Sequence, residues 1–385
     1  MNVMPRILVL TLSFGSGHPR AAQAIAKELK HLAPRAQVWV VDALEDCRRL
    51  FRACYEWPYW LMLRHAPVLW DRLSETRVKR KHQSTAPAWA FRLGCPKVFE
   101  TIRNFQPDTI IAVEVAACEM AVIAKRMGIT RATIVNVITD YEAEPIWVKP
   151  EVEVFTVADD YVRAELIDWG APADRIAVCG IPVDPSFDSN HDHQATLGCY
   201  EVKDDLPLVL LMGGGMGPTR MDEVARRLAA SGVPMHIVAI AGHDKRARRR
   251  LASLKVSSPV SLGVFGWIDE VPALMQAASI LVTKPGGLTM AEAALSSLPV
   301  VLFDPIPGAE LLNARRMAEA GAAVITSGAS ETAKAVVALL RDEASRRVMA
   351  LSSDKIARPN ARREIAQIAV ELAAPAETSA RRMTA

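Results

Sequence analysis

The sequence predicts an α/β protein with two doubly wound, Rossmann-like domains. Short apolar runs alternate with amphipathic helical patterns twice along the 385 residues. The runs are continuous in Val, Ile and Leu, which is typical of parallel strands covered by helices on both faces. A Gly-rich turn follows the first run of each half, at the edge where sheets of this kind bind ligands.

In the first half, strands are expected at 6–12, 37–42, 109–114, 132–138 and 152–157. Helical patterns such as Arg20–Leu32 and Cys118–Met127 fill the intervals between them. In the second half, strands are expected at 208–212, 235–241, 261–265, 279–283, 299–303 and 323–326, before a final helix at about 360–374. The Gly/Pro-rich link at 180–185 separates the halves, which gives domains 1–181 and 182–358 and a C-terminal helix and tail, 359–385.

The overall composition is that of a soluble α/β protein, with 50% hydrophobic and 23% charged residues. The net charge of +3 is too small to indicate a nucleic-acid partner. The six cysteines form no C-x-x-C pair and join no His cluster, so reduced thiols in a cytosolic chain are expected. No stretch reaches about 18 continuous apolar residues, so we expect no transmembrane helix.

One segment, 47–105, departs from the alternating pattern, and we call it the insertion. It holds four of the eight tryptophans, and 48–81 contains nine Lys or Arg against three Asp or Glu, a local excess of six positive charges. Aromatic and basic side chains together favour the interface of an anionic membrane. Membrane-contact candidates are Trp57, Tyr59, Trp60 and Arg64. The alternative is a helical insertion that packs on its own domain with an Arg-coated outer face.

The stretch 279–295 contains a strand, a Pro-Gly-Gly turn and an Ala-rich helix in immediate succession. Unpaired amide groups at such a helix start suit a phosphate or diphosphate, and glycines allow the ligand to approach the backbone closely. Glu292 follows one turn later, where its carboxylate could reach a ribose. Alternatively, Thr289 and Glu292 form a capping box that only satisfies the helix start.

Two further Gly-rich turns each follow the first strand of a domain. The turn at 13–18 presents His18, whose imidazole is suited to removing a proton from a hydroxyl near neutral pH, although many loop histidines have no such role. Arg20 stands where a dinucleotide fingerprint requires its third glycine, and a P-loop Gly-Lys-Ser/Thr is absent. The turn at 213–217 either places a ligand against bare backbone or is a tight strand-to-helix connection.

Five motifs occur together in order, namely Gly15-Ser-Gly-His18, Gly213-Gly-Gly-Met-Gly217, Gly266-Trp-Ile-Asp269, Lys284-Pro-Gly-Gly-Leu-Thr-Met-Ala-Glu292 and Pro305-Ile-Pro-Gly-Ala-Glu310-x-x-Asn313. With this order and spacing, the chain resembles the monogalactosyldiacylglycerol synthase and processive diacylglycerol glucosyltransferase family. It is more distantly similar to the lipid-linked N-acetylglucosaminyltransferase of peptidoglycan synthesis. The resemblance covers roughly 6–325 and implies an inverting GT-B glycosyltransferase, with two Rossmann-like domains facing a central cleft.

The resemblance also implies a role for each matching residue. His18 would be the base, next to Gly17 on the acceptor side, in an N-terminal domain that binds the acceptor and docks on the membrane. The C-terminal domain would bind a UDP-sugar, with Gly214 and Gly215 in the donor site and with Trp267 and Ile268 flanking the uracil. The diphosphate would be bound by Gly286, Gly287, Leu288 and Thr289. Glu292 would bind the ribose, and Glu310 and Asn313 would face the sugar or its phosphates.

The sequence departs from the family pattern at two positions. Ala309 stands where the family often has Gln, so one contact to a sugar hydroxyl is lost. Glu144 stands where the family tends to have His, and it is an alternative base or an acceptor contact. Asp140 either orients His18 or caps a turn. The catalytic candidates are therefore His18, Asp140 and Glu144.

We expect neither a cofactor nor a tightly bound metal, since no Asp-x-Asp pair occurs and backbone amides would carry the donor charge. The reaction implied is transfer of a hexosyl group from a UDP-sugar to 1,2-diacylglycerol, which is glycolipid biosynthesis. A peripheral protein on the cytoplasmic face of the inner membrane is expected, without nucleic acid. The alternatives are a UDP-sugar epimerase, a glycosyltransferase acting on a lipid-linked saccharide, and a non-catalytic nucleotide-sugar-binding protein.

Overall fold

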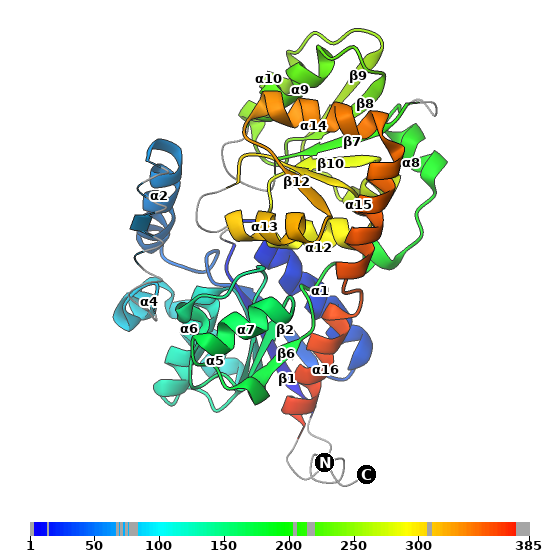
Figure 1. The fold of residues 1–385 in the computed structure, drawn as a ribbon. Coiled ribbons are helices and arrows are strands. Elements are labelled where there is room, and N and C mark those ends of the chain that lie inside the picture. Colours follow the sequence, from blue (N-terminus) through cyan, green and yellow to red (C-terminus); the bar gives the residue numbers. More distant parts are fainter. Residues whose placement is uncertain are drawn as a thin grey trace, which may run out of the picture. The chain divides into compact units, whose positions relative to one another are not determined.

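The computed structural model describes residues 4–13, 15–66, 69, 72–73, 76, 84–202, 206–213, 220–305 and 310–374, without the side chains of 59, 60 and 63–65. The chain divides into two compact units (Figure 1). The first unit is Met1–Pro185 with Pro359–Ala385, and the second is Ser186–Arg358. The division falls at the end of the Gly/Pro link, and the C-terminal helix belongs to the first unit.

The first unit contains a six-stranded parallel sheet of order β2-β1-β3-β4-β5-β6. Its strands are β1 (Arg6–Thr11), β2 (Gln37–Asp42), β3 (Thr109–Val113), β4 (Thr133–Val137), β5 (Val154–Val157) and β6 (Ile176–Val178). The five strands predicted in this half are confirmed. The edge strand β6 was not predicted, because its three half-buried residues give no distinct apolar run.

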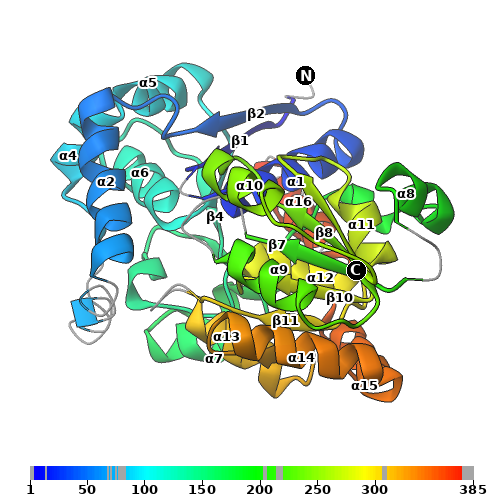
Figure 2. The same cartoon turned by 90° about the horizontal axis from the view of Figure 1, so that it is seen from above.

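Helices cover both faces of the first sheet. The helices of this unit are α1 (Gly17–Leu32), α2 (Arg49–His65), α4 (Ala88–Gly94), α5 (Pro96–Phe105), α6 (Val115–Arg126), α7 (Asp160–Asp168) and α16 (Ala361–Ala373), and of these α2 packs on α4 beside the sheet. Although α1 and α16 come from opposite ends of the chain, they lie side by side (Figure 2). Their apolar faces share one core with the sheet, and Arg362 Nε lies 3.1 Å from Glu28 Oε2. The C-terminal helix therefore completes the core behind His18.

The second unit contains a six-stranded parallel sheet of order β12-β11-β10-β7-β8-β9. Its strands are β7 (Leu208–Met212), β8 (Met235–Ile240), β9 (Val260–Phe265), β10 (Ile280–Thr283), β11 (Val300–Leu302) and β12 (Ala323–Ile325), so all six predicted strands are confirmed. The strand order reverses between β7 and β10, as it does between β1 and β3 in the first sheet. Ligands bind at the carboxyl ends of strands beside such a reversal.

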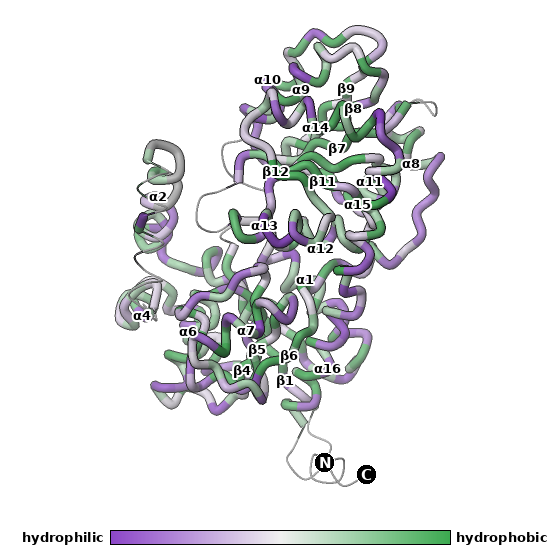
Figure 3. Tube along the Cα trace, in the orientation of Figure 1, coloured by the Kyte–Doolittle hydropathy of each residue, from purple (hydrophilic) through white to green (hydrophobic). Residues whose placement is uncertain are grey.

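The helices of the second unit pack their apolar sides on a core of strand residues. They are α8 (His193–Cys199), α9 (Met221–Ala229), α10 (Lys245–Ala252), α11 (Val271–Ala277), α12 (Gly287–Leu295), α13 (Leu311–Glu319), α14 (Ala329–Arg341) and α15 (Glu343–Ile356). Hydropathy follows the same division, with hydrophobic strands such as β7 and β11 between helices that also carry hydrophilic residues (Figure 3). The helix α10 starts at Lys245 and exposes its basic side chains.

The insertion contains α2 and α4, which pack through aromatic rings. Phe51 stacks on Tyr55 at 5.5 Å and lies 5.9 Å from Phe91 between ring centroids. Gly94 is required at this crossing, because a Cβ there would lie 2.1 Å from the Phe51 ring. The insertion also exposes large apolar side chains to solvent, namely Leu50, Trp57, Leu61, Leu69, Leu73, Trp89 and Leu93.

Candidate active site

His18 lies in the first turn of α1, directly after the loop that leaves β1 at the reversal of strand order. Gly15 supplies a φ of 97° in this loop, a conformation that suits glycine. The Nδ1 atom of His18 lies 2.8 Å from Oγ1 of Thr139, which follows β4 and is 3% exposed. Burial lowers the pKa of His18 to about 4, so the imidazole is neutral at physiological pH.

The other two catalytic candidates lie in the same loop after β4. Asp140 is half-buried next to Thr139, and the half-buried Glu144 precedes a short 3-10 helix, Pro145–Trp147. Thr139 contacts His18, and the sequence had indicated its neighbour Asp140 for that purpose. The roles of Asp140 and Glu144 stay predictions.

Sequence reasoning missed Glu114, which ends β3 beside β1. Thr11 Oγ1 donates to the Val113 carbonyl at 3.3 Å, so the ends of the two strands are adjacent. Glu114 has a φ of 116°, which is strained for a residue with a side chain, and its Oε2 accepts the amide protons of Ala116 at 2.7 Å and Ala117 at 3.2 Å. Burial raises the pKa of Glu114 to about 8. The available signal was a Glu directly after an entirely apolar strand.

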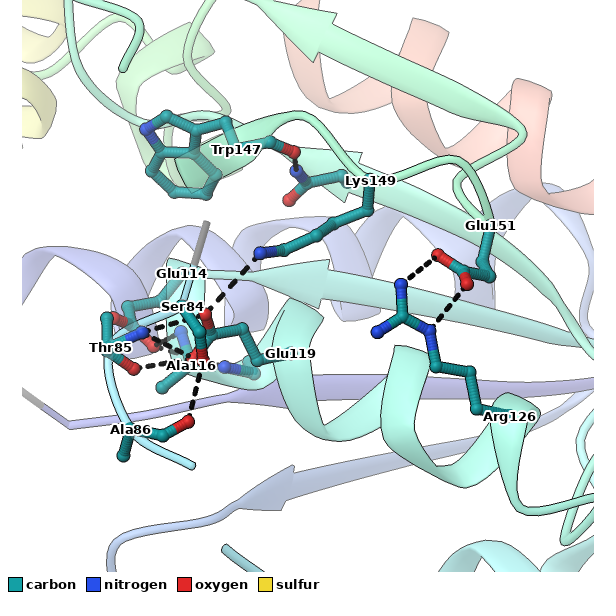
Figure 4. A network of polar contacts seen from close by, with 12 residues as sticks. Ser84, Thr85, Ala86, Glu114, Ala116, Glu119, Arg126, Trp147, Lys149 and Glu151 are labelled. Atoms are coloured by element: carbon teal, nitrogen blue, oxygen red, sulfur yellow. Dashed lines mark hydrogen bonds and ion pairs between the residues drawn. The ribbon is translucent and has the colours of Figure 1, made fainter. Parts of the chain in front are cut away.

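A polar network ties Thr85 of the insertion to α6, the helix that Glu114 caps (Figure 4). The Glu119 carboxylate accepts hydrogen bonds from the Thr85 backbone at 2.9 Å and from its hydroxyl at 2.5 Å. Lys149 Nζ lies 3.5 Å from Glu119 Oε1, and both side chains are less than a tenth exposed. A carboxylate buried this deeply requires such partners, so Thr85 is held firmly against α6.

In the second unit, the turn after β10 leads into α12, which begins at Gly287 with Gly286 as its N-cap. No side chain caps this helix start. Thr289 is the third helical residue, so the alternative of a capping box between Thr289 and Glu292 is wrong. Glu292 lies one turn further along and is 1% exposed. As a glycine, the N-cap residue Gly286 offers no side chain to the amide groups of the first turn.

Residues from α13 come to the same turn. The Asn313 side-chain amide donates to the Pro285 carbonyl at 3.1 Å and is fully buried. Oε1 of Glu310 lies 4.0 Å from the point that a Cβ on Gly286 would occupy, and Oγ1 of Thr289 lies 3.9 Å from it. The structure therefore brings two of the predicted motifs, 284–292 and 305–313, together around the start of α12. Leu288 is buried within its first turn.

Trp267 and Ile268 follow β9 at the same edge of the second sheet. The Trp267 ring is 42% exposed and stacks on His243, with 4.6 Å between centroids and 5° between planes. Its Nε1 donates to Asp269 Oδ1 at 3.2 Å. Sequence reasoning missed His243, which follows β8 and gave no motif.

The roles of several predicted site residues stay predictions. Gly214 and Gly215 lie outside the described residues, as do the side chains of Tyr59, Trp60 and Arg64. Gly17 is the first residue of α1, and Trp57 is 67% exposed on α2. Among the residues that the structure describes, no three His, Cys, Asp or Glu side chains form a group that could hold a metal ion. The described helices include none with the length and apolarity to cross a bilayer.

Two family models match consecutive parts of the chain. The monogalactosyldiacylglycerol (MGDG) synthase model matches residues 18–183, and the model for glycosyl transferases group 1 matches residues 216–355. A processive diacylglycerol beta-glucosyltransferase of Bacillus cereus is 27% identical over 357 residues, which are 92% of this chain and 90% of that protein.

Solved structures match nearly the whole chain at low identity. Acinetobacter baumannii MurG has a TM-score of 0.61 at 15% identity and covers 95% of this chain and 99% of its own. Anabaena Alr3699/HepE in complex with UDP-glucose has a TM-score of 0.58 at 17% identity, with coverage of 94% and 98%. A putative UDP-N-acetylglucosamine 2-epimerase from Listeria monocytogenes has a TM-score of 0.58 at 14% identity, with coverage of 94% and 95%.

These similarities and the two sheets establish the GT-B fold that the sequence predicted. The structural matches alone do not distinguish a transferase from an epimerase, because both kinds of enzyme share this fold. The family models and the relative in Bacillus cereus make that distinction. The first half of the chain thus matches the monogalactosyldiacylglycerol synthase family and the second half matches glycosyl transferases group 1, so the protein is a glycosyltransferase with the GT-B fold.

Proposed function

We propose that this protein transfers a hexosyl group from a UDP-sugar to the hydroxyl of 1,2-diacylglycerol, with inversion at the anomeric carbon. The observation that carries the proposal is the convergence of Gly286, Thr289 and Glu310 at the start of α12, with Glu292 one turn further along the same helix. The acceptor is supported by the activity of the relative, a diacylglycerol beta-glucosyltransferase, and by the match to MGDG synthases.

The donor site would bind the nucleotide mainly through its backbone. The backbone amides of the first turn and the positive end of the helix dipole at Gly287 would attract a diphosphate without a metal ion. The Glu292 carboxylate accepts hydrogen bonds from the ribose hydroxyls, while Trp267 and Ile268 flank the uracil. Asn313 holds the turn in shape through its bond to the Pro285 carbonyl. Calorimetric titration of the protein with UDP tests this site, and absence of heat with every uridine nucleotide would refute it.

The chemical step is a single displacement. The lipid hydroxyl oxygen attacks the anomeric carbon, the bond from that carbon to the UDP oxygen breaks, and the hydroxyl proton moves to Nε2 of His18. UDP departs with the bonding electron pair, and the α12 amides stabilise its charge. His18 enters the reaction as a neutral base, because burial favours the uncharged imidazole.

The pH dependence of kcat/KM should report this neutral base. Only protonation stops His18 from accepting a proton, and its pKa of about 4 places that event well below neutrality. We therefore expect His18 to cause no loss of activity between pH 8 and pH 5, and a fall as the pH approaches 4. Rate measurements across this range with a fixed UDP-sugar test the assignment. An acid limb at the ordinary histidine pKa of about 6.5 would contradict it.

The insertion would dock the protein on an anionic membrane, which places it peripherally on the cytoplasmic face of the inner membrane. Leu50, Trp57 and Leu61 are spaced seven and four residues apart on α2, so they share one side of the helix. All three are more than 40% exposed. Trp89 and Leu93 form a second exposed pair on α4. Clustered apolar side chains among Arg residues fit the headgroup region of a bilayer.

Replacing both Trp57 and Trp89 with Ala is expected to weaken binding to vesicles of anionic phospholipid by about tenfold or more, because each indole loses its place at the interface. Vesicle co-sedimentation measures the effect. The matched control replaces Val348 and Leu351, two exposed apolar residues of α15, with Ala and should change nothing. Equal losses in the two double variants would show that the insertion has no special role.

A further inference from the structure

We propose that Thr139 is a positioning residue for His18, and that it keeps the proton of the neutral imidazole on Nδ1 so that Nε2 faces the acceptor hydroxyl. The inference rests on the proposed function, in which His18 is the base. It gives a role to the uncharged hydroxyl of Thr139, which the sequence had not indicated.

The position of the Thr139 hydroxyl is well fixed. Thr139 lies two residues beyond the end of β4, and its side chain is 3% exposed. The preceding residue, Ile138, donates its amide proton to the Thr156 carbonyl of β5 at 3.0 Å, which continues the pairing of the sheet. A β-branched side chain has few rotamers, so Oγ1 is held in place before any substrate arrives. A fixed partner restrains the rotation of the imidazole ring.

The direction of the hydrogen bond decides which nitrogen can act as the base. If Nδ1–H donates to Oγ1, the Nε2 lone pair is available to the acceptor, and the same bond persists after Nε2 takes a proton. If the hydroxyl donated to Nδ1 instead, Nε2 would carry the proton and could not accept another. Only the first arrangement allows proton transfer without reversing the contact.

The bond should also strengthen during the reaction. Nδ1–H becomes a better donor as the ring gains positive charge, so Thr139 stabilises the transition state more than the resting enzyme. A hydroxyl adds no negative charge, which agrees with a pKa of His18 that burial alone lowers. His18 is therefore deprotonated at Nε2 at neutral pH, and its hydrogen bond to Thr139 strengthens when Nε2 takes the proton.

The kinetic test is the variant Thr139→Val, which keeps the shape of the side chain and removes its hydroxyl. We expect kcat to fall about tenfold with an unchanged KM for the UDP-sugar, because one hydrogen bond is lost at the base. Thr139→Ser should retain most of the activity. The control is Thr156→Val, a buried Thr of β5 whose hydroxyl has no hydrogen-bond partner among the described residues. A Thr139→Val enzyme with a kcat within twofold of the original would overturn the proposal.

Two measurements do not depend on the stability of the Val variant. NMR of protein labelled with ¹⁵N-histidine shows which nitrogen carries the proton, and the His18→Asn variant identifies the signal. A proton on Nδ1 supports the proposal, and a proton on Nε2 overturns it.

In Thr139→Asp, an added carboxylate should raise the pKa of His18 and move the acid limb of kcat/KM to higher pH, and an unmoved limb would contradict the contact. If His18→Ala itself kept full activity, the proposed base would fail first, whatever Thr139 does.

Discussion

Replacing His18 with Ala is expected to lower glycosyl transfer by about 10²- to 10⁴-fold, the usual contribution of a positioned general base. His18 is proposed to take the proton of the lipid hydroxyl in the chemical step, so the loss should appear in kcat. UDP should still bind, because the proposed donor site consists of residues of the second unit. Single-turnover measurements with saturating UDP-sugar would separate the chemical step from binding.

The matched control is His31→Ala, at the other end of the same helix, where the side chain is exposed. It should leave turnover and thermal stability unchanged. Turnover of His18→Ala within a few-fold of the original protein would reject the base assignment. Glu144 would then be the next candidate to replace, since it stands where the family tends to have His.

Replacing Glu292 with Ala is expected to weaken UDP binding by about 1–3 kcal/mol, or about 5- to 150-fold in Kd, because charged hydrogen bonds to the ribose are lost. The UDP affinity of Glu292→Gln should lie between that of the original protein and that of Glu292→Ala, since the amide oxygen of Gln still accepts a hydrogen bond. Calorimetry with UDP measures the change. The glycosyl transfer rate at saturating donor should fall much less than the affinity.

The control for Glu292 is Glu343→Gln, the exposed first residue of α15 in the same unit. It should affect neither binding nor melting temperature. Because Glu292 is 1% exposed, its replacement also disturbs packing, so the melting temperature is measured in parallel. An unchanged UDP affinity together with a lower melting temperature would indicate a purely structural role for Glu292.

Much of the fold could be predicted from the sequence because its strands are strongly apolar. Strands such as β3 and β7 are completely buried, so most of their residues are hydrophobic, and β7 is an uninterrupted run of Leu, Val and Met. The edge strand β6 is half-buried and three residues long, and it gave no such signal. One alternative for α12, a capping box between Thr289 and Glu292, was wrong. The N-cap residue is Gly286, so the helix begins before Thr289.

The candidate site could be predicted only where its residues form local motifs. The 284–292 motif indicated the helix start at α12 because strand, turn and helix are consecutive in the chain. The contact between His18 and Thr139 joins residues 121 positions apart, and it depends on how β1, β3 and β4 align.

Glu114 and Glu119 were missed for a different reason. Each looks like an ordinary helix residue in the sequence, and only burial and the contacts with the Ala116 amide and Thr85 distinguish them. Burial of a carboxylate follows from tertiary packing that single-sequence patterns do not contain. The link from Thr85 to α6 was equally invisible, since the two segments are 34 residues apart.

The most direct test of the central claim is a product assay with purified protein, vesicles of anionic phospholipid containing diacylglycerol, and UDP-glucose or UDP-galactose in separate reactions. Mass spectrometry and NMR of the products are expected to show a hexosyl diacylglycerol with the inverted, β anomeric configuration and an equal amount of UDP. An epimerised UDP-sugar, a product formed only on a lipid-linked saccharide, or bound nucleotide without any turnover would contradict the account.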